Sequence, residues 1–402
     1  MQNLGDVVTL YSKKKDISKI LEKIKNNNYH LNVFDKLIFS FFAEVEKEIL
    51  KFKDLKKYPD LFALGFFLRK KNLEKIINYY EINNRMPLGV IFHITPSNMP
   101  TNFFYSYFFG LICGNVNIVR IPDKNYFQIK ILVNILKKIF ILKKYKRIKN
   151  MSYFLRYKKN TNFTNEASKI CDCRIVWGSE ETIHNIRKIS IPSKSREVTF
   201  SDKYSCTIIN TDYINKKTNK EILNLCNFFF SDAYFVDQNA CSSPHLILWH
   251  GKKNPSLKKF FWTEVNNIAI KNYDMPFIGS VDKFTQECED ATKLKIKKTY
   301  NLNNITIINE LLKISNNLSD LRGKWGYFYE FDLSNLDDLK LIISEKFQTL
   351  SYIGYEKSKL LNVLKKNRIK GIDRIVPIGN SHVMDTKWDG YDMIYSLTRV
   401  IN

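Results

Sequence analysis

The stretch that decides the fold is residues 88–121, LGVIFHITPSNMPTNFFYSYFFGLICGNVNIVRI. It begins with an apolar run that closes at Pro96, and such a run is typical of a strand buried on both faces. Pro100 marks a helix start, and the aromatic residues behind it continue to the turn at Cys113 and Gly114. NVNIVRI then returns to strand. A strand, a helix and a second strand in this order predict a parallel sheet.

The same alternation continues along the chain. The spacing of apolar residues predicts an amphipathic helix over 126–145, and the polar, basic segment 148–165 is interpreted as a surface excursion or hairpin. CRIVWG predicts a strand ending at Gly178, and SEETIHNIRKI opens with Ser and two acidic residues, as helix N-termini do. REVTF and SCTIIN are two further strands. Together these elements predict a doubly wound α/β domain.

The flanking regions complete the predicted organisation. Apolar residues three and four apart from Ser12 to Asn84 predict an all-helical lead-in, and a second alternating block places a strand at HLILWH between helices over 215–230 and 256–271. We expect an α/β protein with a helical N-terminal region, a doubly wound α/β domain on which this region packs, a second α/β domain and a C-terminal tail. Their predicted ranges are 1–85, 86–210, 211–375 and 376–402.

Composition excludes some classes and leaves one alternative open. The 402 residues are 44% apolar, which is ample for two or three domains. The net charge of +24 raises the alternative of a basic nucleic-acid-binding protein without catalysis, but the lysines are spread over the chain and no binding motif accompanies them. The seven cysteines show no metal-ligand spacing and no disulfide density. With neither a secretory signal nor a membrane span in the pattern, we expect a cytoplasmic protein that binds no nucleic acid and no metal.

Cys241 is the candidate nucleophile. It stands in VDQNACSSP, where small, turn-forming neighbours lie between a helix and a strand started by Pro244. A thiol on such a turn presents its sulfur and its own backbone N–H in one direction, as attack on a carbonyl requires. A lone cysteine in an apolar-rich chain is more often a small buried hydrophobe, which we expect of Cys113, Cys206 and Cys226.

Two further motifs follow buried strands. PSNMPTN places Asn98 at the carboxyl end of its strand, where open α/β sheets bind ligands, although Asn98 and Thr101 would equally serve as helix caps. WGSEETI delivers a glycine and then a helix N-terminus, which can offer backbone amides to a pyrophosphate. It lacks the three-glycine dinucleotide fingerprint. His93 is expected to be a core histidine, and the aromatic run 103–109 is either a buried helix or the lining of an acyl tunnel.

Taken in order, GVIFHITPSNMPTNFFYSYFFGLICGNVNIVRIPDKN, VWGSEETI, REVTFSDKYS, DQNACSSP, FQTLSYIG and WDGYD resemble the bacterial long-chain acyl-CoA reductase family, known from luminescence operons. The resemblance covers about Met86 to the end of the sequence. This family is similar to a divergent branch of the aldehyde dehydrogenase superfamily. The resemblance implies that residues 86–210 are a dinucleotide-binding domain, on which residues 1–85 pack, and that residues 211–375 are a catalytic domain carrying the nucleophilic cysteine.

The resemblance implies a role for particular residues. The implied catalytic residues are Cys241 as the nucleophile, Asn98 as a hydrogen-bond donor to the oxyanion, and Glu197 as a general base or proton-transfer group. Cofactor contacts fall on Thr95, Pro96, Ser97, Arg120, Gly178, Ser179 and Thr182. The superfamily's glycine pair after the glutamate is replaced by Val198, Thr199 and Phe200, and its glutamine two places before the cysteine is Asn239.

The implied activity is NAD(P)H-dependent reduction of a fatty acyl thioester, acyl-CoA or acyl-protein, to an aldehyde through a Cys241 acyl-enzyme. Basic residues such as Arg120 and Lys124 favour NADPH over NADH. An acyl-protein synthetase or acyltransferase partner and a homo-oligomer are also implied. The alternative within enzymes is an aldehyde dehydrogenase acting in the oxidative direction.

Overall fold

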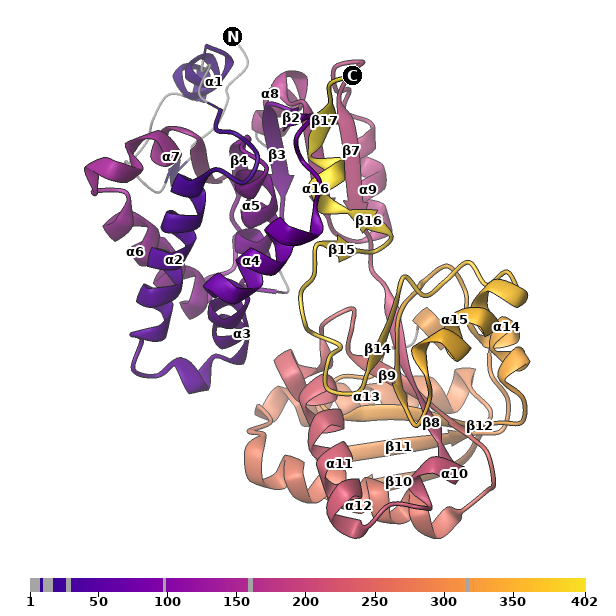
Figure 1. Cartoon of the computed structure of the whole chain (residues 1–402). Helices are drawn as coiled ribbons and strands as arrows, with labels where there is room; N and C mark the ends of the chain where they lie inside the picture. Colours follow the sequence, from indigo (N-terminus) through magenta and orange to yellow (C-terminus); the bar gives the residue numbers. More distant parts are fainter. Residues whose placement is uncertain are drawn as a thin grey trace. The chain divides into compact units, whose positions relative to one another are not determined.

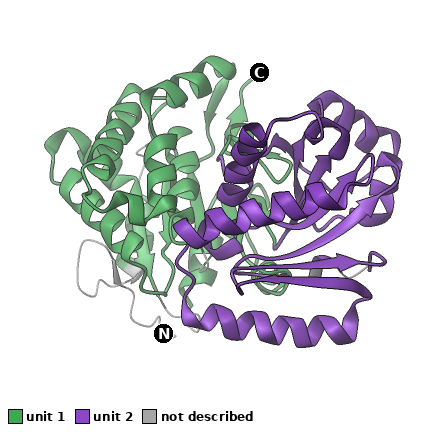
Figure 2. Ribbon diagram, turned by 90° about the horizontal axis from the view of Figure 1, so that it is seen from below, with its two compact units in different colours: residues 1–201, 384–402 green, residues 202–383 purple. Residues whose placement is uncertain are grey.

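The computed structural model describes residues 8–9, 17–26, 30–96, 99–157, 162–315, 318–320 and 322–402 (Figure 1). These residues form two compact units, which Figure 2 colours separately. Unit 1 comprises residues 1–201 and 384–402, and unit 2 comprises residues 202–383. The chain therefore leaves unit 1 once and returns to it for its last 19 residues.

Unit 1 is built on a six-stranded sheet with the order β1-β5-β4-β3-β6-β7. All neighbouring strands are parallel except the β1–β5 pair. The strands are β1 (Val8–Thr9), β3 (Val90–Ile94), β4 (Val116–Arg120), β5 (Ser152–Arg156), β6 (Cys173–Trp177) and β7 (Arg196–Phe200). From β3 the chain moves outward to β4 and β5, then returns beside β3 as β6. The strand order reverses between β3 and β6, which confirms the doubly wound prediction.

Helices and short ladders complete unit 1. The helices are α1 (Ile17–Lys25), α2 (Lys36–Leu50), η1 (Leu55–Lys57), α3 (Pro59–Phe67), α4 (Lys70–Tyr79), α5 (Asn102–Ile112), α6 (Phe127–Ile139), η2 (Lys143–Tyr145), α7 (Lys146–Asn150), α8 (Phe163–Ile170), α9 (Glu180–Arg187) and α16 (Met393–Ser396). Two antiparallel ladders pair β2 (Arg85–Pro87) with β17 (Thr398–Val400), and β15 (Lys387–Trp388) with β16 (Tyr391–Asp392). One hydrophobic core runs from the lead-in helices through the sheet, so the helical region packs on this sheet.

The segment 148–165 differs from its prediction. It was interpreted as a surface excursion, yet it contains most of α7 and all of β5, which pairs with β4 inside the sheet. Within β5, Ser152, Phe154 and Leu155 are buried while Tyr153 and Arg156 are partly exposed. The flanking lysines and asparagines lower the average hydropathy of the window, so the short apolar strand was concealed.

Unit 2 is built on a seven-stranded sheet with the order β10-β11-β12-β9-β8-β13-β14. Only the β10–β11 edge hairpin is antiparallel. The strands are β8 (Tyr204–Asn210), β9 (Pro244–His250), β10 (Ile296–Leu302), β11 (Thr306–Leu311), β12 (Tyr327–Leu333), β13 (Phe347–Ile353) and β14 (Arg374–Pro377). The helices are α10 (Thr211–Ile214), α11 (Asn219–Tyr234), η3 (Phe235–Gln238), α12 (Pro255–Asn272), α13 (Phe277–Lys293), η4 (Leu318–Asp320), η5 (Leu336–Asp338), α14 (Leu339–Ile342) and α15 (Lys357–Lys366).

Two cores cover the two faces of this sheet. Leu246 and Leu248 of β9 belong to one core, whereas Ile247 and Trp249 belong to the other. Alternate side chains of a strand point to opposite faces, so β9 is buried on both, as its apolar run predicts. Among the helices in the described ranges, none is long and apolar enough to cross a bilayer.

The division into units differs from the predicted domain ranges at two places. β8 was grouped with the dinucleotide-binding domain, but it pairs with β9 and β13 in the sheet of unit 2. The predicted tail, 376–402, is shared: residues 376–383 lie in unit 2, and 384–402 lie in unit 1. Periodicity identifies a strand, but its sheet is decided by long-range partners that local sequence does not encode.

Candidate active site

The carboxyl ends of β3, β4 and β6 gather most of the residues predicted to hold a cofactor. Thr95 and Pro96 follow β3, Arg120 ends β4, and Gly178 follows β6. β3 lies between β4 and β6 in the sheet, so these positions share one edge, at the point where the strand order reverses. Doubly wound sheets bind ligands in the crevice at such a point. Ser97 and Asn98 lie outside the described residues.

The turn after β6 is built to bring backbone close to helix α9. Ser179 caps the helix, its Oγ accepting from the Thr182 backbone N–H at 3.2 Å and lying 3.0 Å from Thr182 Oγ1. A Cβ on Gly178 would lie 3.0 Å from Thr182 Cγ2, closer than most side-chain contacts. The structure thus brings Gly178, Ser179 and Thr182 into one capped turn, where a bare backbone can approach a ligand.

Arg120 provides a cation at the same edge. Its backbone carbonyl accepts from Thr95 Oγ1 at 2.5 Å, which joins the ends of β3 and β4. The guanidinium pairs with Asp123 at 3.0 Å and lies over the Tyr157 ring. Its Nε is buried and has no hydrogen-bond partner. A buried donor without an acceptor is costly in a protein, so an anionic ligand group at this edge would find a partner here.

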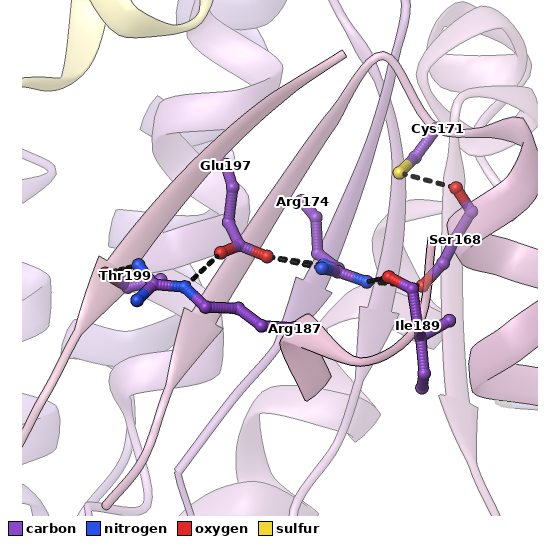
Figure 3. Close-up of polar contacts among 7 residues, drawn as sticks. All are labelled: Ser168, Cys171, Arg174, Arg187, Ile189, Glu197 and Thr199. Atoms are coloured by element: carbon purple, nitrogen blue, oxygen red, sulfur yellow. Dashed lines mark hydrogen bonds and ion pairs between the residues drawn. The ribbon is translucent and has the colours of Figure 1, made fainter. Parts of the chain in front are cut away.

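Glu197 lies away from this edge. It is the second residue of β7 and pairs in register with Arg174 of β6, which in turn pairs with Phe92 of β3, whereas the predicted cofactor residues follow the last residues of these strands. Its carboxylate accepts from Arg174 Nε at 2.9 Å and from Arg187 Nε at 2.8 Å (Figure 3). The structure therefore does not bring Glu197 together with Thr95 or Gly178, and its catalytic role stays a prediction.

Arg174 extends this ion-pair cluster into the core of unit 1. Its side chain is 2% exposed, and its Nη1 also donates to the Ile189 carbonyl at 2.9 Å and to Ser168 Oγ at 3.2 Å. Figure 3 shows the Glu197 carboxylate between the two arginines, with Ser168 and Ile189 on the far side of Arg174. A buried guanidinium needs such a partner set, so Glu197 balances the charge of Arg174.

Cys241 lies in unit 2, on the turn before β9. Of the seven cysteines, five are buried, among them Cys113, Cys206 and Cys226 as predicted, whereas Cys241 is partly exposed and Cys288 is exposed. The turn lies at the amino end of β9, beside the amino end of β8, because Ser205 Oγ of β8 donates to the Cys241 carbonyl at 2.6 Å.

The approach to Cys241 is fixed by an unusual backbone. Val236, Asp237 and Gln238 all have positive φ, from 44° to 62°, which side chains other than glycine rarely adopt. Gln238 is buried, and its amide donates to the Pro244 and Tyr327 carbonyls while its oxygen accepts from the backbone of Gly326 and Tyr327. Strained backbone of this kind persists only where the surroundings over-determine it, and it gathers at functional sites.

One polar group at this turn was missed by sequence reasoning. The hydroxyl of Ser242, the residue after Cys241, lies 2.9 Å from His382 Nδ1, and His382 Nε2 lies 2.7 Å from the backbone carbonyl of Asp232. These residues are about 140 and 150 positions apart in the sequence, and no local pattern links them. Only the sequence GNSH after a buried strand could have drawn attention to His382.

Other predicted residues have structural surroundings. His93 is fully buried in unit 1, with Nδ1 2.8 Å from Ser106 Oγ and Nε2 3.0 Å from Asn117 Oδ1, which confirms it as a core histidine. The aromatic run 103–109 lies in α5, and every member is buried against other rings or aliphatic side chains. Within the described ranges, no group of three or more His, Cys, Asp or Glu could hold a metal ion.

Solved structures with this architecture are aldehyde dehydrogenases. KauB of Pseudomonas aeruginosa matches with a TM-score of 0.67 at 14% identity, covering 96% of this chain and 88% of its own. GapN of Methanocaldococcus jannaschii, a glyceraldehyde-3-phosphate dehydrogenase solved with NADP, matches with a TM-score of 0.66 at 14% identity, covering 100% and 99%. A benzaldehyde dehydrogenase of Corynebacterium glutamicum gives 0.65 at 10%, covering 99% and 94%. The fold is thus of the aldehyde dehydrogenase type.

The family follows from the sequence match. The model of the acyl-CoA reductase (LuxC) family matches residues 12–268, well over half of the chain, so the chain belongs to this family. The match begins before Met86, where the resemblance was expected to start, and it includes Cys241. No curated protein matches the chain. Family and fold together define an oxidoreductase that acts on acyl or aldehyde groups.

Proposed function

We propose that the chain reduces a fatty acyl thioester to the aldehyde, with Cys241 as nucleophile and NADPH as hydride donor. The observation that carries the proposal is the partly exposed Cys241 on its tightly bonded turn, inside the region that matches the acyl-CoA reductase family.

Cys241 performs the covalent step. Its thiolate attacks the thioester carbonyl carbon, the C–S bond to the departing thiol breaks, and the acyl group becomes a thioester of Cys241. Exchange of one thioester for another is nearly balanced in free energy, which suits a thiol nucleophile. The resemblance assigns the stabilisation of the negative oxygen formed during attack to the Cys241 backbone N–H and to the carboxamide of Asn98. After the carbonyl carbon has been reduced, the Cys241 thiolate is expelled and the aldehyde departs.

The edge of unit 1 at β3, β4 and β6 is assigned to the cofactor. Gly178, Ser179 and Thr182 would offer backbone and hydroxyl groups to the pyrophosphate, and Thr95, Pro96 and Ser97 would line the crevice. Arg120 would approach the ribose, and its positive charge favours the phosphate of NADPH over the hydroxyl of NADH. The bound nicotinamide supplies the hydride. The partnerless Nε of Arg120 and the close-packed Gly178 turn fit such a ligand.

Glu197 is assigned no contact with substrate in this proposal. A reductase gains nothing from activating water, because water would hydrolyse the acyl-enzyme. The carboxylate already accepts from Arg174 and Arg187, and this fits a role in balancing buried charge.

The test is acyl transfer to the protein from an alkyne-tagged long-chain acyl-CoA, followed by peptide mapping with and without NADPH. We expect label on Cys241 that NADPH removes as tagged aldehyde, and no label in Cys241→Ala. Cys288→Ala is the matched control, since this exposed cysteine lies in the same unit and should be dispensable. Label on Cys288, or release as free acid with or without NADPH, would refute the proposal, and the acid product would support the oxidative alternative.

A further inference from the structure

A loop far along the chain from Cys241 is locked onto helix α11 in unit 2. The carboxylate of Asp232 accepts from the backbone N–H of Gly379 at 2.7 Å, from that of Ser381 at 3.0 Å and from Ser381 Oγ at 2.8 Å. Arg374 holds the same loop from the other side, donating to the carbonyls of Ser381 and Val383 at 2.8 and 2.9 Å. Both charged side chains are buried. A loop held by this many buried, charge-assisted bonds has one conformation.

The locked loop orients the His382 ring. Its Nε2 lies 2.7 Å from the Asp232 carbonyl, and the ring stacks on Phe235 at 4.7 Å between centroids. A carbonyl can only accept, so Nε2 carries the proton and donates. Burial lowers the pKa of His382 to about 4, so the ring is neutral near pH 7 and Nδ1 is an acceptor.

Nδ1 of His382 faces the nucleophile turn. It lies 2.9 Å from the hydroxyl of Ser242, which therefore donates to it. On the preceding residue, the Cys241 carbonyl accepts from Ser205 Oγ at 2.6 Å, and Ser205 Oγ accepts from the Thr349 backbone N–H at 3.1 Å. The peptide between Cys241 and Ser242 is thus held by one hydroxyl on each side.

From this geometry we propose that His382 is a positioning residue for Cys241, acting through the hydroxyl of Ser242. The proposal rests on the function proposed for Cys241 and extends that site to a histidine–serine pair and its anchor, Asp232. His382 fixes the orientation of the Cys241–Ser242 peptide and so restrains the Cα of Cys241, which carries the thiol and is bonded to the backbone N that stabilises the oxyanion. A misplacement of about 1 Å in such a group can cost about 100-fold in rate.

The test compares His382→Phe, Ser242→Ala and the double variant. Phenylalanine keeps the stacking on Phe235 but lacks the acceptor, and alanine lacks the donor. We expect each single variant to slow the burst of CoA release that accompanies Cys241 acylation by about 10- to 100-fold, with KM for acyl-CoA unchanged. The double variant should be no slower than the slower single variant, because both changes remove one interaction.

His250→Phe is the matched control. His250 Nδ1 also lies within hydrogen-bond distance of a hydroxyl, that of Tyr355 at 2.7 Å. His250 is the last residue of β9, at the opposite end of the strand from Cys241. The burst of CoA release in His250→Phe should therefore equal that of the wild type. If His382→Phe fails to unfold cooperatively, Ser242→Ala carries the test alone, because it removes the donor and leaves the His382 ring and its bond to the Asp232 carbonyl in place.

A second readout separates this proposal from the proposed function. The rate of Cys241 alkylation by iodoacetamide, referenced to Cys288 in the same sample, should fall several-fold in both single variants, whether or not acyl-CoA is the substrate. Absence of acylation in the wild type would refute the proposed function alone. Wild-type bursts and alkylation ratios in folded variants, or a double variant that shows the product of the two single effects, would overturn the role of His382.

Discussion

Glu197 illustrates how the surroundings of one residue decide its role. From the resemblance it takes the place of a general base, yet its carboxylate is shared by Arg174 and Arg187. The Arg174 side chain is 2% exposed, whereas that of Arg187 is 59% exposed. The buried arginine needs the negative charge of Glu197 more than the exposed one does, because water solvates Arg187.

For Glu197→Gln we expect the free energy of unfolding of unit 1 to fall by about 3 kcal/mol, because Arg174 is left buried without a counter-charge. The acylation of Cys241 should be unchanged. Arg187→Gln is the control and should cost no more than about 1 kcal/mol, as exposed pairs do. Denaturant unfolding and the CoA burst measure the two effects. A stable Glu197→Gln protein without reductase activity would restore the catalytic role.

For single residues, the sequence predicts the structural position where that position depends on neighbours along the chain. Ser179 as a helix cap, His93 in the core and Cys241 on a turn could all be derived from adjacent residues, and the structure places them so. His382 and Asp232 could not, because their function depends on contacts across about 140 positions. A buried polar network is specified by the folded chain and leaves no periodic pattern in the sequence.

The packing of helix α5 on the sheet of unit 1 depends on a glycine. A Cβ on Gly110 would lie 1.8 Å from Asn117 Oδ1 of β4 and 3.0 Å from His93 Nε2 of β3. Asn117 Oδ1 is hydrogen-bonded to His93, so the helix approaches the two strands where their buried polar side chains meet. No side chain fits between the helix and these strands.

Gly110→Ala should therefore lower the free energy of unfolding by at least about 3 kcal/mol, since the helix must move off the sheet or the buried hydrogen bond must break. The comparison is Gly65→Ala in α3, where the nearest atom to the new Cβ is a methyl of Ile49 at 3.0 Å, and where the gain in helix propensity offsets most of the strain. Equal stability of the two variants in urea titrations would show that α5 can shift without cost.

Elements were predictable wherever an apolar run was long and bounded. β3, β4, β6 and β9 lie within one or two residues of their predicted ranges, because each is a continuous buried run with a turn signal at its end. β5 was missed because its five residues are flanked by lysines and asparagines. The sheet to which β8 belongs was missed because both candidate sheets accept the same kind of strand.

Across the whole molecule, three histidines with lowered pKa values link stability to pH. Burial lowers the pKa of His93 to about 4, of His245 to about 3 and of His382 to about 4. In the unfolded chain a histidine titrates near pH 6.5, so between this value and the lowered one the unfolded state binds more protons. Their contribution to stability is fully present above pH 6.5 and is lost as the pH falls towards 4.

Asp232 acts in the opposite sense. Burial raises the pKa of its carboxyl to about 6, so its contribution is present at low pH and is lost as the pH rises through 6. Each histidine changes the free energy of unfolding by at most about 3 kcal/mol between pH 6.5 and 4. The opposite change from Asp232 is about as large as that of one histidine, so it cancels one of the three.

We therefore expect a net loss of stability on acidification from about pH 7 to about pH 5, measured by urea unfolding at each pH. In His93→Gln the free energy of unfolding of unit 1 should lose the part of its pH dependence that comes from one proton. The pH dependence of unit 2 should not change. If the free energy of unfolding of unit 1 changes with pH equally in His93→Gln and in the wild type, His93 is not neutral in the folded state.

The return of the chain to unit 1 has a consequence for how the protein is made. Residues 384–402 bring Trp388, Met393, Ile394 and Leu397 into the core of unit 1. The guanidinium of Arg196 donates to the backbone carbonyls of Tyr395, Ser396 and Thr398 in the same segment. A ribosome delivers unit 2 as one continuous stretch before it delivers this segment. Although most of unit 1 is synthesised first, its core therefore stays open until residues 202–383 have been made, and its apolar side chains are exposed during that time.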